Sequence, residues 1–316
     1  MMANKINELR ATKPKSEKLR ESWDDKLFGL IVTLVLTVLF VFFLYPVWFV
    51  LIASISNPDL VYTGKVTILP MDIDFGGYAR VFKNKDVWIG YGNTVFYTVV
   101  GTLLNVATTT MVGYAVSRRD LRGGKVIMTL FIITMYFGGG MIPEYLNVKG
   151  LGLTDTRLFM LINGLVGPTN VIICRTFFRN SIPWEMQEAA FIDGASDFYV
   201  FTKIILPLSK AILAVMCITY AVSHWNSYFS AMIYLKDDMK YPLQVFLREI
   251  LIQTDLASMM VDDTNPDALA TVVAAERVAN QLKYALIVVS TVPILSVYPF
   301  VEKYFDKGFM IGGIKG

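Results

Sequence analysis

The sequence predicts an all-α integral membrane protein whose helices cross the bilayer six times. Hydrophobic residues make up 54% of the 316-residue chain and charged residues only 17%, whereas a soluble globular domain carries about 25% charged residues. Six segments are also apolar over most of the roughly 20 residues that a helix needs to cross the hydrocarbon core. These segments cover residues 28–52, 93–116, 126–146, 158–174, 211–235 and 284–301.

The first segment and the third and fourth need separate justification. Residues 28–52 carry no charge and are longer than the apolar core of a signal peptide, and no small-x-small cleavage site follows them, so we expect a retained anchor. The third and fourth segments are interrupted by Gly138-Gly139-Gly140, Pro143 and Pro168. The three glycines are compatible either with close helix packing or with local unwinding, and the sequence does not decide between them.

The distribution of basic residues predicts the orientation of the spans. Seven Lys and Arg residues precede residue 27, and four more lie among the eight residues 118–125. The loop at 236–283 is instead rich in Asp. Because cytoplasmic loops carry the excess of Lys and Arg, both termini, the 118–125 loop and the segment around 182–207 are expected in the cytosol.

The chain is accordingly divided into a cytosolic tail at 1–27, a transmembrane domain at 28–303 and a cytosolic tail at 304–316. The outer loop also contains a stretch after Pro266 that is typical of a helix start.

Residues 182–207 predict two short helices joined by a tight turn. Ser181, ahead of Pro183 and Glu185, suits a helix N-cap. Gly194 suits the left-handed residue at the end of that helix, and Ser196 can cap the next one. Small side chains at Ala189 and Ala190 would let another protein approach closely, although a loop packed on its own bundle has the same composition.

Several function classes find no support in the sequence. A net charge of +3 does not point to nucleic acid. Cys174 and Cys217 lie in or beside apolar segments and are expected to pack as small hydrophobic residues. No His/Cys cluster suggests a metal site. The nucleotide-binding pattern G-x-x-x-x-G-K-[ST] is missing, and Gly123-Gly124-Lys125 is the nearest string.

Polar and aromatic residues gather at 223–230 within the fifth span. Trp225, Asn226, Ser227 and Tyr228 are candidates for contact with a solute, because polar atoms facing lipid are costly. The same residues are also typical of helix–helix hydrogen bonding. His224, the single histidine of the sequence, is either a proton relay or a neutral packed side chain.

The segment Glu188-Ala189-Ala190, with Gly194 and then Ile204-x-Leu206-Pro207, resembles the signature of bacterial ABC importer permeases. Asn93-Thr94, Tyr114-Ala115 with Arg118, Trp225-Asn226 and the glycine-rich end at 307–316 resemble further family motifs. The surrounding residues resemble the carbohydrate-uptake branch of binding-protein-dependent permeases. Within that branch, residues 298–316 resemble the subgroup that imports oligosaccharides and polysaccharide fragments, including acidic ones.

The resemblance implies a type I importer fold with a cytosolic coupling helix formed by Glu188, Ala189, Ala190, Asp193 and Gly194. It implies a transport subunit rather than an enzyme, in a bacterial cell membrane, without a cofactor of its own. The implied partners are a second permease subunit, two cytosolic ATPase subunits that bind ATP and Mg, an extracytoplasmic binding protein and a sugar or oligosaccharide.

Two alternatives remain open at this point. An ion-coupled secondary sugar transporter would also be a helical bundle, although the spans contain almost no paired carboxylates. Import of a different solute, such as an amino acid or a peptide, also fits an importer permease.

Overall fold

The computed structural model describes residues 22–259, 277, 279–297 and 299. The chain forms two compact units, Met1–Val50 and Leu51–Gly316. The tail at 304–316, most of the tail at 1–27 and the helix predicted after Pro266 lie outside the described residues.

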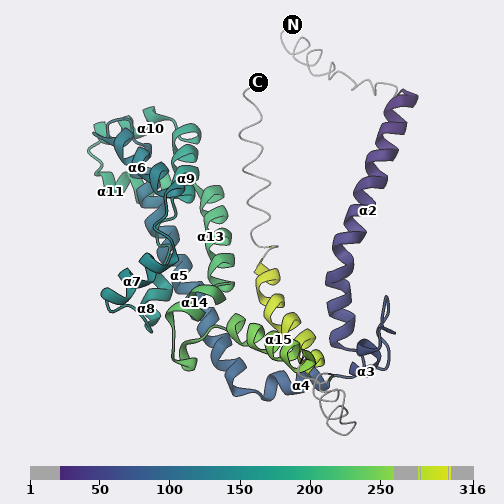
Figure 1. Cartoon of the computed structure of the whole chain (residues 1–316). Helices are drawn as coiled ribbons and strands as arrows, with labels where there is room; N and C mark the ends of the chain where they lie inside the picture. The colour runs from purple at the N-terminus through teal and green to yellow at the C-terminus, as the bar shows by residue number, and fades with distance from the viewer. Residues whose placement is uncertain (1–21, 260–276, 278, 298, 300–316) are drawn as a thin grey trace. The chain divides into compact units, whose positions relative to one another are not determined.

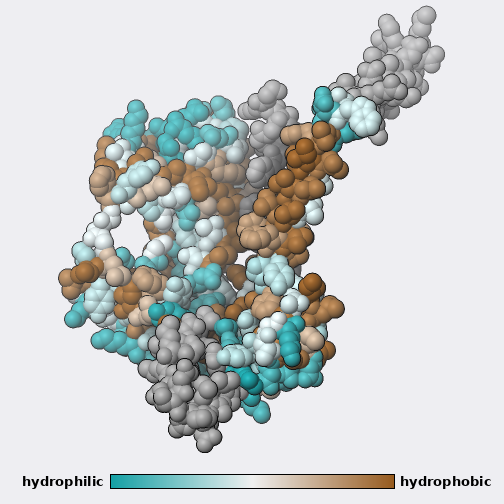
Figure 2. Space-filling model, turned by 45° about the vertical axis from the view of Figure 1, so that its right-hand side comes forward, coloured by the Kyte–Doolittle hydropathy of each residue, from teal (hydrophilic) through white to brown (hydrophobic). Residues whose placement is uncertain are grey.

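The first unit contains most of one long helix, α2, which spans Trp23–Ser54. Asp24 and Asp25 lie in its first turn, where negative charge is favourable to the helix dipole. Its side chains are almost uniformly hydrophobic (Figure 2), and none before Ile52 is buried. An apolar helix of 32 residues that exposes its side chains is suited to a lipid environment.

The second unit is built around α5, which spans Lys85–Ser117 and packs against α13, α9, α15 and α8. The predicted coupling segment, residues 182–207 with α10 and α11, lies at one end of this unit, and α4 and α15 lie at the opposite end (Figure 1). The bounds are α3 Pro58–Tyr62, α4 Gly76–Lys83, α6 Gly124–Tyr136, α7 Met141–Gly150, α8 Arg157–Ile162, α9 Pro168–Ser181, α10 Trp184–Ile192, α11 Asp197–Tyr199, η1 Val200–Ile205, α12 Leu206–Leu208, α13 Lys210–Trp225, α14 Tyr228–Tyr234, η2 Asp238–Lys240 and α15 Leu243–Met259, and a further helix covers Ala279–Val297.

Two glycines let other helices lie close to α5. A Cβ atom added at Gly113 would lie 2.6 Å from Cys174 Cβ of α9, and one added at Gly101 would lie 2.5 Å from the His224 ring of α13. Because real Cβ atoms do not approach so closely, these crossings require glycine. Cys174 is fully buried there, as its apolar context predicts, whereas Cys217 is exposed on the surface of α13.

The helices confirm an all-α protein able to span a membrane, but they do not test the count of six. Three described helices are long and apolar enough to cross alone: Trp23–Ser54, Lys85–Ser117 and Ala279–Val297. Two bent pairs bring the number to five if each pair is one span. These pairs are α6 with α7, bent by 115°, and the Asp197–Leu208 segment with α13, bent by 84°.

Three of the predicted segments, 126–146, 158–174 and 211–235, are not single helices. The segment 158–174 is divided between α8 and α9, because Gly164 adopts a φ of +68° and α9 begins at Pro168, which has no N–H to continue a helix. The segment 211–235 is divided at Asn226 and Ser227 into α13 and α14.

The glycine triplet interrupts the segment 126–146 by local unwinding. Residues 137–140 are not helical, and Gly140 has a φ of +84°. A Cβ atom added at Gly138 would meet nothing within 4 Å, so Gly138 is not closely packed against the described part of the chain. The structure therefore decides between the two possibilities that the sequence leaves open.

Candidate coupling site and membrane cavity

The predicted helix–turn–helix is present and has the expected turn. Helix α10 covers Trp184–Ile192, and Gly194 follows with a φ of +82°, a conformation that favours glycine. The Ser196 side chain accepts a hydrogen bond from the Tyr199 amide at 3.3 Å and so caps α11, as predicted.

The predicted cap at Ser181 is wrong. Ser181 is the last residue of α9, and the residue before α10 is Pro183, which makes no side-chain capping bond. Only Ile182 and Pro183 separate the two helices, and Ile182 is buried in the core beside them. Because α9 continues through Ser181, its hydroxyl is not at the start of the next helix.

The five predicted coupling residues lie together on α10 and its turn. Glu188, Ala189, Asp193 and Gly194 are exposed, and Ala190 packs partly against the core. The Glu188 carboxylate accepts a hydrogen bond from Trp184 Nε1 at 2.6 Å. Nearby, the apolar Ile192 and Phe198 are 86% and 71% exposed. This surface, which we call the α10 surface, combines small, acidic and apolar side chains in a form suited to binding another protein.

A buried contact fastens the inner side of α10 to α5. Gln187 is the buried residue of α10, and its Oε1 accepts a hydrogen bond from the Tyr114 hydroxyl at 3.0 Å. The Tyr114 ring stacks on Phe201, with 5.2 Å between ring centroids, and meets the edge of Phe178. Tyr114 therefore joins α5, α9, α10 and the π-helix η1 in one packed cluster.

Arg118, directly after α5, forms a second attachment to the coupling segment. Its guanidinium forms ion pairs with Asp120 and Asp197, and it lies over the Phe191 ring at 5.2 Å from the centroid. The hydrogen bond to Asp120 raises the pKa of Arg118 above its ordinary value, and the same bond lowers the pKa of Asp120. Both groups are therefore charged at any physiological pH.

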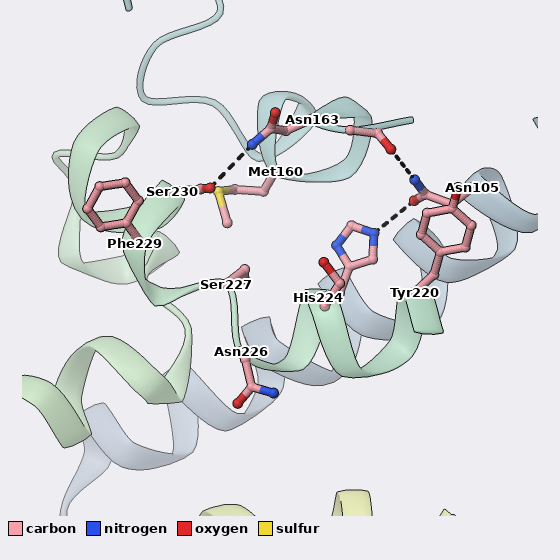
Figure 3. A pocket seen from close by; sticks show the side chains of 11 residues that line it. Asn105, Met160, Asn163, Tyr220, His224, Asn226, Ser227, Phe229 and Ser230 are labelled. Atoms are coloured by element: carbon pink, nitrogen blue, oxygen red, sulfur yellow. Dashed lines mark hydrogen bonds between the residues drawn. The ribbon is translucent and has the colours of Figure 1, made fainter. Parts of the chain in front are cut away.

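A polar cavity of about 260 Å³ lies between α5, α8, α13 and α14 (Figure 3). Asn105 organises one wall: its Nδ2 donates to the Gly164 carbonyl at 2.8 Å, and its Oδ1 lies 2.8 Å from His224 Nε2. Because Oδ1 can only accept, His224 Nε2 carries the proton of this bond. His224 is thus a packed, hydrogen-bonded side chain. We call this space the central cavity; its lining is Asn105, Met160, Asn163, Gly164, Tyr220, Ser223, His224, Asn226, Ser227, Phe229 and Ser230.

The structure brings two of the four predicted solute-path residues to the central cavity. Asn226 and Ser227 line it, at the break between α13 and α14. Trp225 is buried elsewhere and donates from Nε1 to the Ser290 carbonyl at 2.9 Å. Tyr228 is 40% exposed and does not line this cavity. Trp225 ends α13 and Tyr228 begins α14, so these two residues lie on helices on either side of the break that holds Asn226 and Ser227.

A second cavity adjoins the first on the side away from His224. It has a volume of about 580 Å³ and shares Asn163, Phe229 and Ser230 with the central cavity. Glu144 and the unwound residues 138–140 also line it. The break in the helix at the glycine triplet therefore opens onto the same space.

The Asn93-Thr94 motif at the other end of α5 has a structural role. Asn93 Nδ2 donates to the carbonyls of Met239 and Tyr241, at 2.9 and 3.0 Å, and Thr94 Oγ1 accepts from the Leu243 amide at 2.8 Å. These bonds fasten the segment before α15 to α5.

Sequence reasoning missed Gln187, Asn105 and Asn163 as parts of these sites. Polar residues at 105 and 163 within apolar helical segments were the available signal. Gln187 gave none, because glutamine is common on exposed helices. Among the described residues, no group of three or more His, Cys, Asp or Glu could hold a metal ion.

Comparisons with known proteins place the chain in a family. The family described as "binding-protein-dependent transport system inner membrane component" matches residues 121–311, which is more than half of the chain. The chain belongs to this family. Members of this permease family are transport components, and separate subunits of such systems hydrolyse ATP.

Individual relatives of this permease are similar over almost their whole length. The polygalacturonan/rhamnogalacturonan transport system permease protein YtcP of Bacillus subtilis is 35% identical, over 92% of this chain and 99% of that protein. Protein LplC of the same organism is 38% identical, over 86% of this chain and 89% of its own. A solved bacterial ABC transporter involved in import of the acidic polysaccharide alginate contains a chain with a TM-score of 0.81 and 35% identity, covering 91% of this chain and 100% of that one.

Proposed function

We propose that this permease is the membrane subunit of an ATP-driven importer for a sugar or an oligosaccharide. The relatives support this substrate class, because YtcP is named for polygalacturonan and rhamnogalacturonan and the solved neighbour for alginate. An ion-coupled secondary carrier is not supported by any of these relatives. The polar central cavity is consistent with a hydroxyl-bearing solute.

The observation that carries the proposed mechanism is the double attachment of α10 to α5. An exposed α10 surface, with Glu188, Ala189, Ala190, Asp193 and Gly194, is available to a cytosolic ATPase subunit. Its inner side is held by Tyr114 and Arg118. A displacement of α10 would therefore move the end of α5 as well, instead of being absorbed in a loose loop.

In this mechanism, the ATPase pair biases a two-state equilibrium of the bundle. Closure of the pair on ATP moves α10, and the cavities open to the opposite side of the membrane. The sequence lacks the G-x-x-x-x-G-K-[ST] pattern, so in this mechanism ATP and Mg are bound by the partner subunits. A second permease subunit completes the path, and an extracytoplasmic binding protein delivers the sugar.

The proposed topology places both termini, the 118–125 loop and α10 in the cytosol of a bacterial cell. Two termini on the same side of the membrane require an even number of spans. The number is six if the α8–α9 segment, broken between Ile162 and Pro168, also crosses the membrane. In that arrangement, α4 and α15 lie at the outer end. The domain from 28 to 303 then forms the bundle, and the coupling segment covers about 182–207.

Glu188→Lys and Gly194→Pro test the proposed coupling. Proline cannot adopt the φ of +82° seen at Gly194 and lacks the amide that donates to the Phe191 carbonyl. We expect both variants to reach the membrane and to lose sugar uptake. Normal sugar-stimulated ATP hydrolysis and uptake in both variants would contradict the proposal.

A further inference from the structure

We propose that the central cavity is a subsite for an uncharged sugar ring and does not accept a uronate carboxylate. This inference rests on the proposed function and concerns the substrate chemistry of this subunit. Its basis is the charge and the hydrogen-bonding capacity of the side chains that line the cavity.

The lining of the central cavity contains no Lys, Arg, Asp or Glu. Its polar groups are three asparagine amides, three serine hydroxyls, one tyrosine hydroxyl and His224. The adjoining cavity adds one charged residue, Glu144, which carries the same sign as a uronate. A carboxylate moved into this space would lose hydration without gaining a cation, and burial of an unpaired charge is strongly unfavourable.

Hydrogen bonds within the wall leave acceptor capacity on the cavity side. Because His224 Nε2 donates to Asn105 Oδ1, a neutral His224 ring keeps Nδ1 as an acceptor. The second ring nitrogen faces the side on which Ser227 lies (Figure 3). A sugar hydroxyl can donate to such an acceptor, whereas an ionised carboxylate only accepts.

Ser227 supplies an independent indication of a ligand. Its Oγ is buried and has no hydrogen-bond partner in the described part of the chain. An unpaired buried hydroxyl destabilises a fold by about 1–3 kcal/mol, so a hydroxyl that lines a cavity suggests a partner that arrives with the solute. The neighbouring Asn226 amide donates to the Val222 carbonyl at 2.9 Å and keeps its oxygen available.

The size of the central cavity also limits its occupant. About 260 Å³ is slightly below the range of about 300–1,000 Å³ that is typical of pockets for drug-sized ligands. The cavity therefore suits one ring of an oligosaccharide, and the adjoining cavity of about 580 Å³ has room for the rings that follow. Carboxylates on a longer substrate would have to be met by another subunit.

The test compares two trisaccharides that differ only at carbon 6. The importer, purified with its partner subunits in lipid nanodiscs, is equilibrated with galactotriose or trigalacturonate, and binding is measured without the extracytoplasmic binding protein. We expect tighter binding of galactotriose. Ser227→Ala should weaken galactotriose binding by about 3- to 10-fold, the effect of one lost hydrogen bond, and leave trigalacturonate unchanged.

Two further variants serve as a control outside the cavity and as a test of the effect of charge within it. Ser290→Ala removes a hydroxyl whose bond goes to the Ile287 carbonyl and which does not line the cavity, so it should change neither affinity. Asn226→Lys adds a cation at an exposed lining position and should raise trigalacturonate affinity.

Trigalacturonate binding at least as tightly as galactotriose, with Ser227→Ala changing neither, would overturn the uncharged subsite. ATP-driven sugar uptake measured in the same samples would then show that the importer function still holds. Failure to take up any sugar with ATP would instead overturn the proposed function and the subsite with it.

Discussion

The Tyr114 hydroxyl of α5 donates a hydrogen bond to Gln187 Oε1 of α10 over 3.0 Å, and both side chains are buried. The two residues are 73 positions apart in the sequence. This bond joins the long helix α5 to a short surface helix, and the Tyr114 ring also packs against Phe178 and Phe201 beside it.

Tyr114→Phe should weaken coupling between ATP hydrolysis and uptake. It leaves Gln187 Oε1 buried without a donor, which costs about 1–3 kcal/mol. We expect the amount of sugar imported per ATP hydrolysed to fall in reconstituted importer. Tyr199→Phe, at a tyrosine that is 54% exposed on α11, should change nothing. If Tyr114→Phe and Tyr199→Phe both import the same amount of sugar per ATP hydrolysed as the wild-type chain, the Tyr114–Gln187 bond has no role in coupling.

Arg118→Lys should reduce uptake with little loss of stability. The planar guanidinium contacts Asp120, Asp197 and the Phe191 ring together, and an ammonium group cannot reproduce all three contacts. Because the pairs are partly exposed, the free energy of unfolding should fall by only about 1 kcal/mol or less. Arg119→Lys, at the exposed neighbouring position, is the matched control. Full uptake by the Arg118 variant would be incompatible with this attachment.

The elements that the sequence predicted well are those determined by local chemistry. A short helix was expected from residue 185, and the structure has a helix at Trp184–Ile192 that is followed by the left-handed turn at Gly194. The span at 93–116 lies within α5, whose apolar composition is continuous. The Ser181 cap failed because α9 continues to that residue, which is a matter of tertiary packing rather than of local preference.

The contacts that make the sites were not predictable from the sequence. Tyr114 with Gln187 and Asn105 with His224 join residues 73 and 119 positions apart, and no local pattern indicates such pairs. Hydrophobicity showed that residues 223–230 were unusual for a membrane span. It could not show that Trp225 turns toward Ser290 while Ser227 faces the cavity.

Gly101→Ala should destabilise the bundle. An added Cβ would lie 2.5 Å from the His224 ring, so α5 and α13 would have to separate. Overpacking of this kind costs about 1–3 kcal/mol. Gly92→Ala, on the same helix with nothing within 4 Å, should be neutral or slightly stabilising. Thermal unfolding of the two variants in detergent checks the difference, and equal unfolding temperatures would rule out the close approach at Gly101.

Asp155 should contribute stability that disappears in acid. Its carboxylate accepts hydrogen bonds from the Lys236 and Asp237 amides, and these bonds lower its pKa below the ordinary value of 3.8. A lowered folded-state pKa gives stability that is complete above the unfolded value and is lost as the pH falls through the folded value. The wild-type chain should therefore be more stable than Asp155→Asn at pH 6, and the difference should shrink below about pH 4. Unfolding temperatures of the two chains measured between pH 6 and pH 4 and below test this prediction. A difference in unfolding temperature that persists at the lowest pH would contradict a stabilising role of the ionised Asp155.

Cysteine cross-linking at Ala189 tests the central claim most directly. Ala189 is exposed on the α10 surface, so Ala189→Cys adds a reactive thiol without disturbing the core. The substitution is made in a Cys217→Ser background, because Cys217 is exposed on α13 whereas Cys174 is buried, and that background chain is the control. We predict that the new thiol is labelled only from the cytosolic side and cross-links to the ATPase subunit, with a yield that changes when ATP binds. Labelling from the outside of the cell, or no cross-link to an ATPase subunit, would contradict the account.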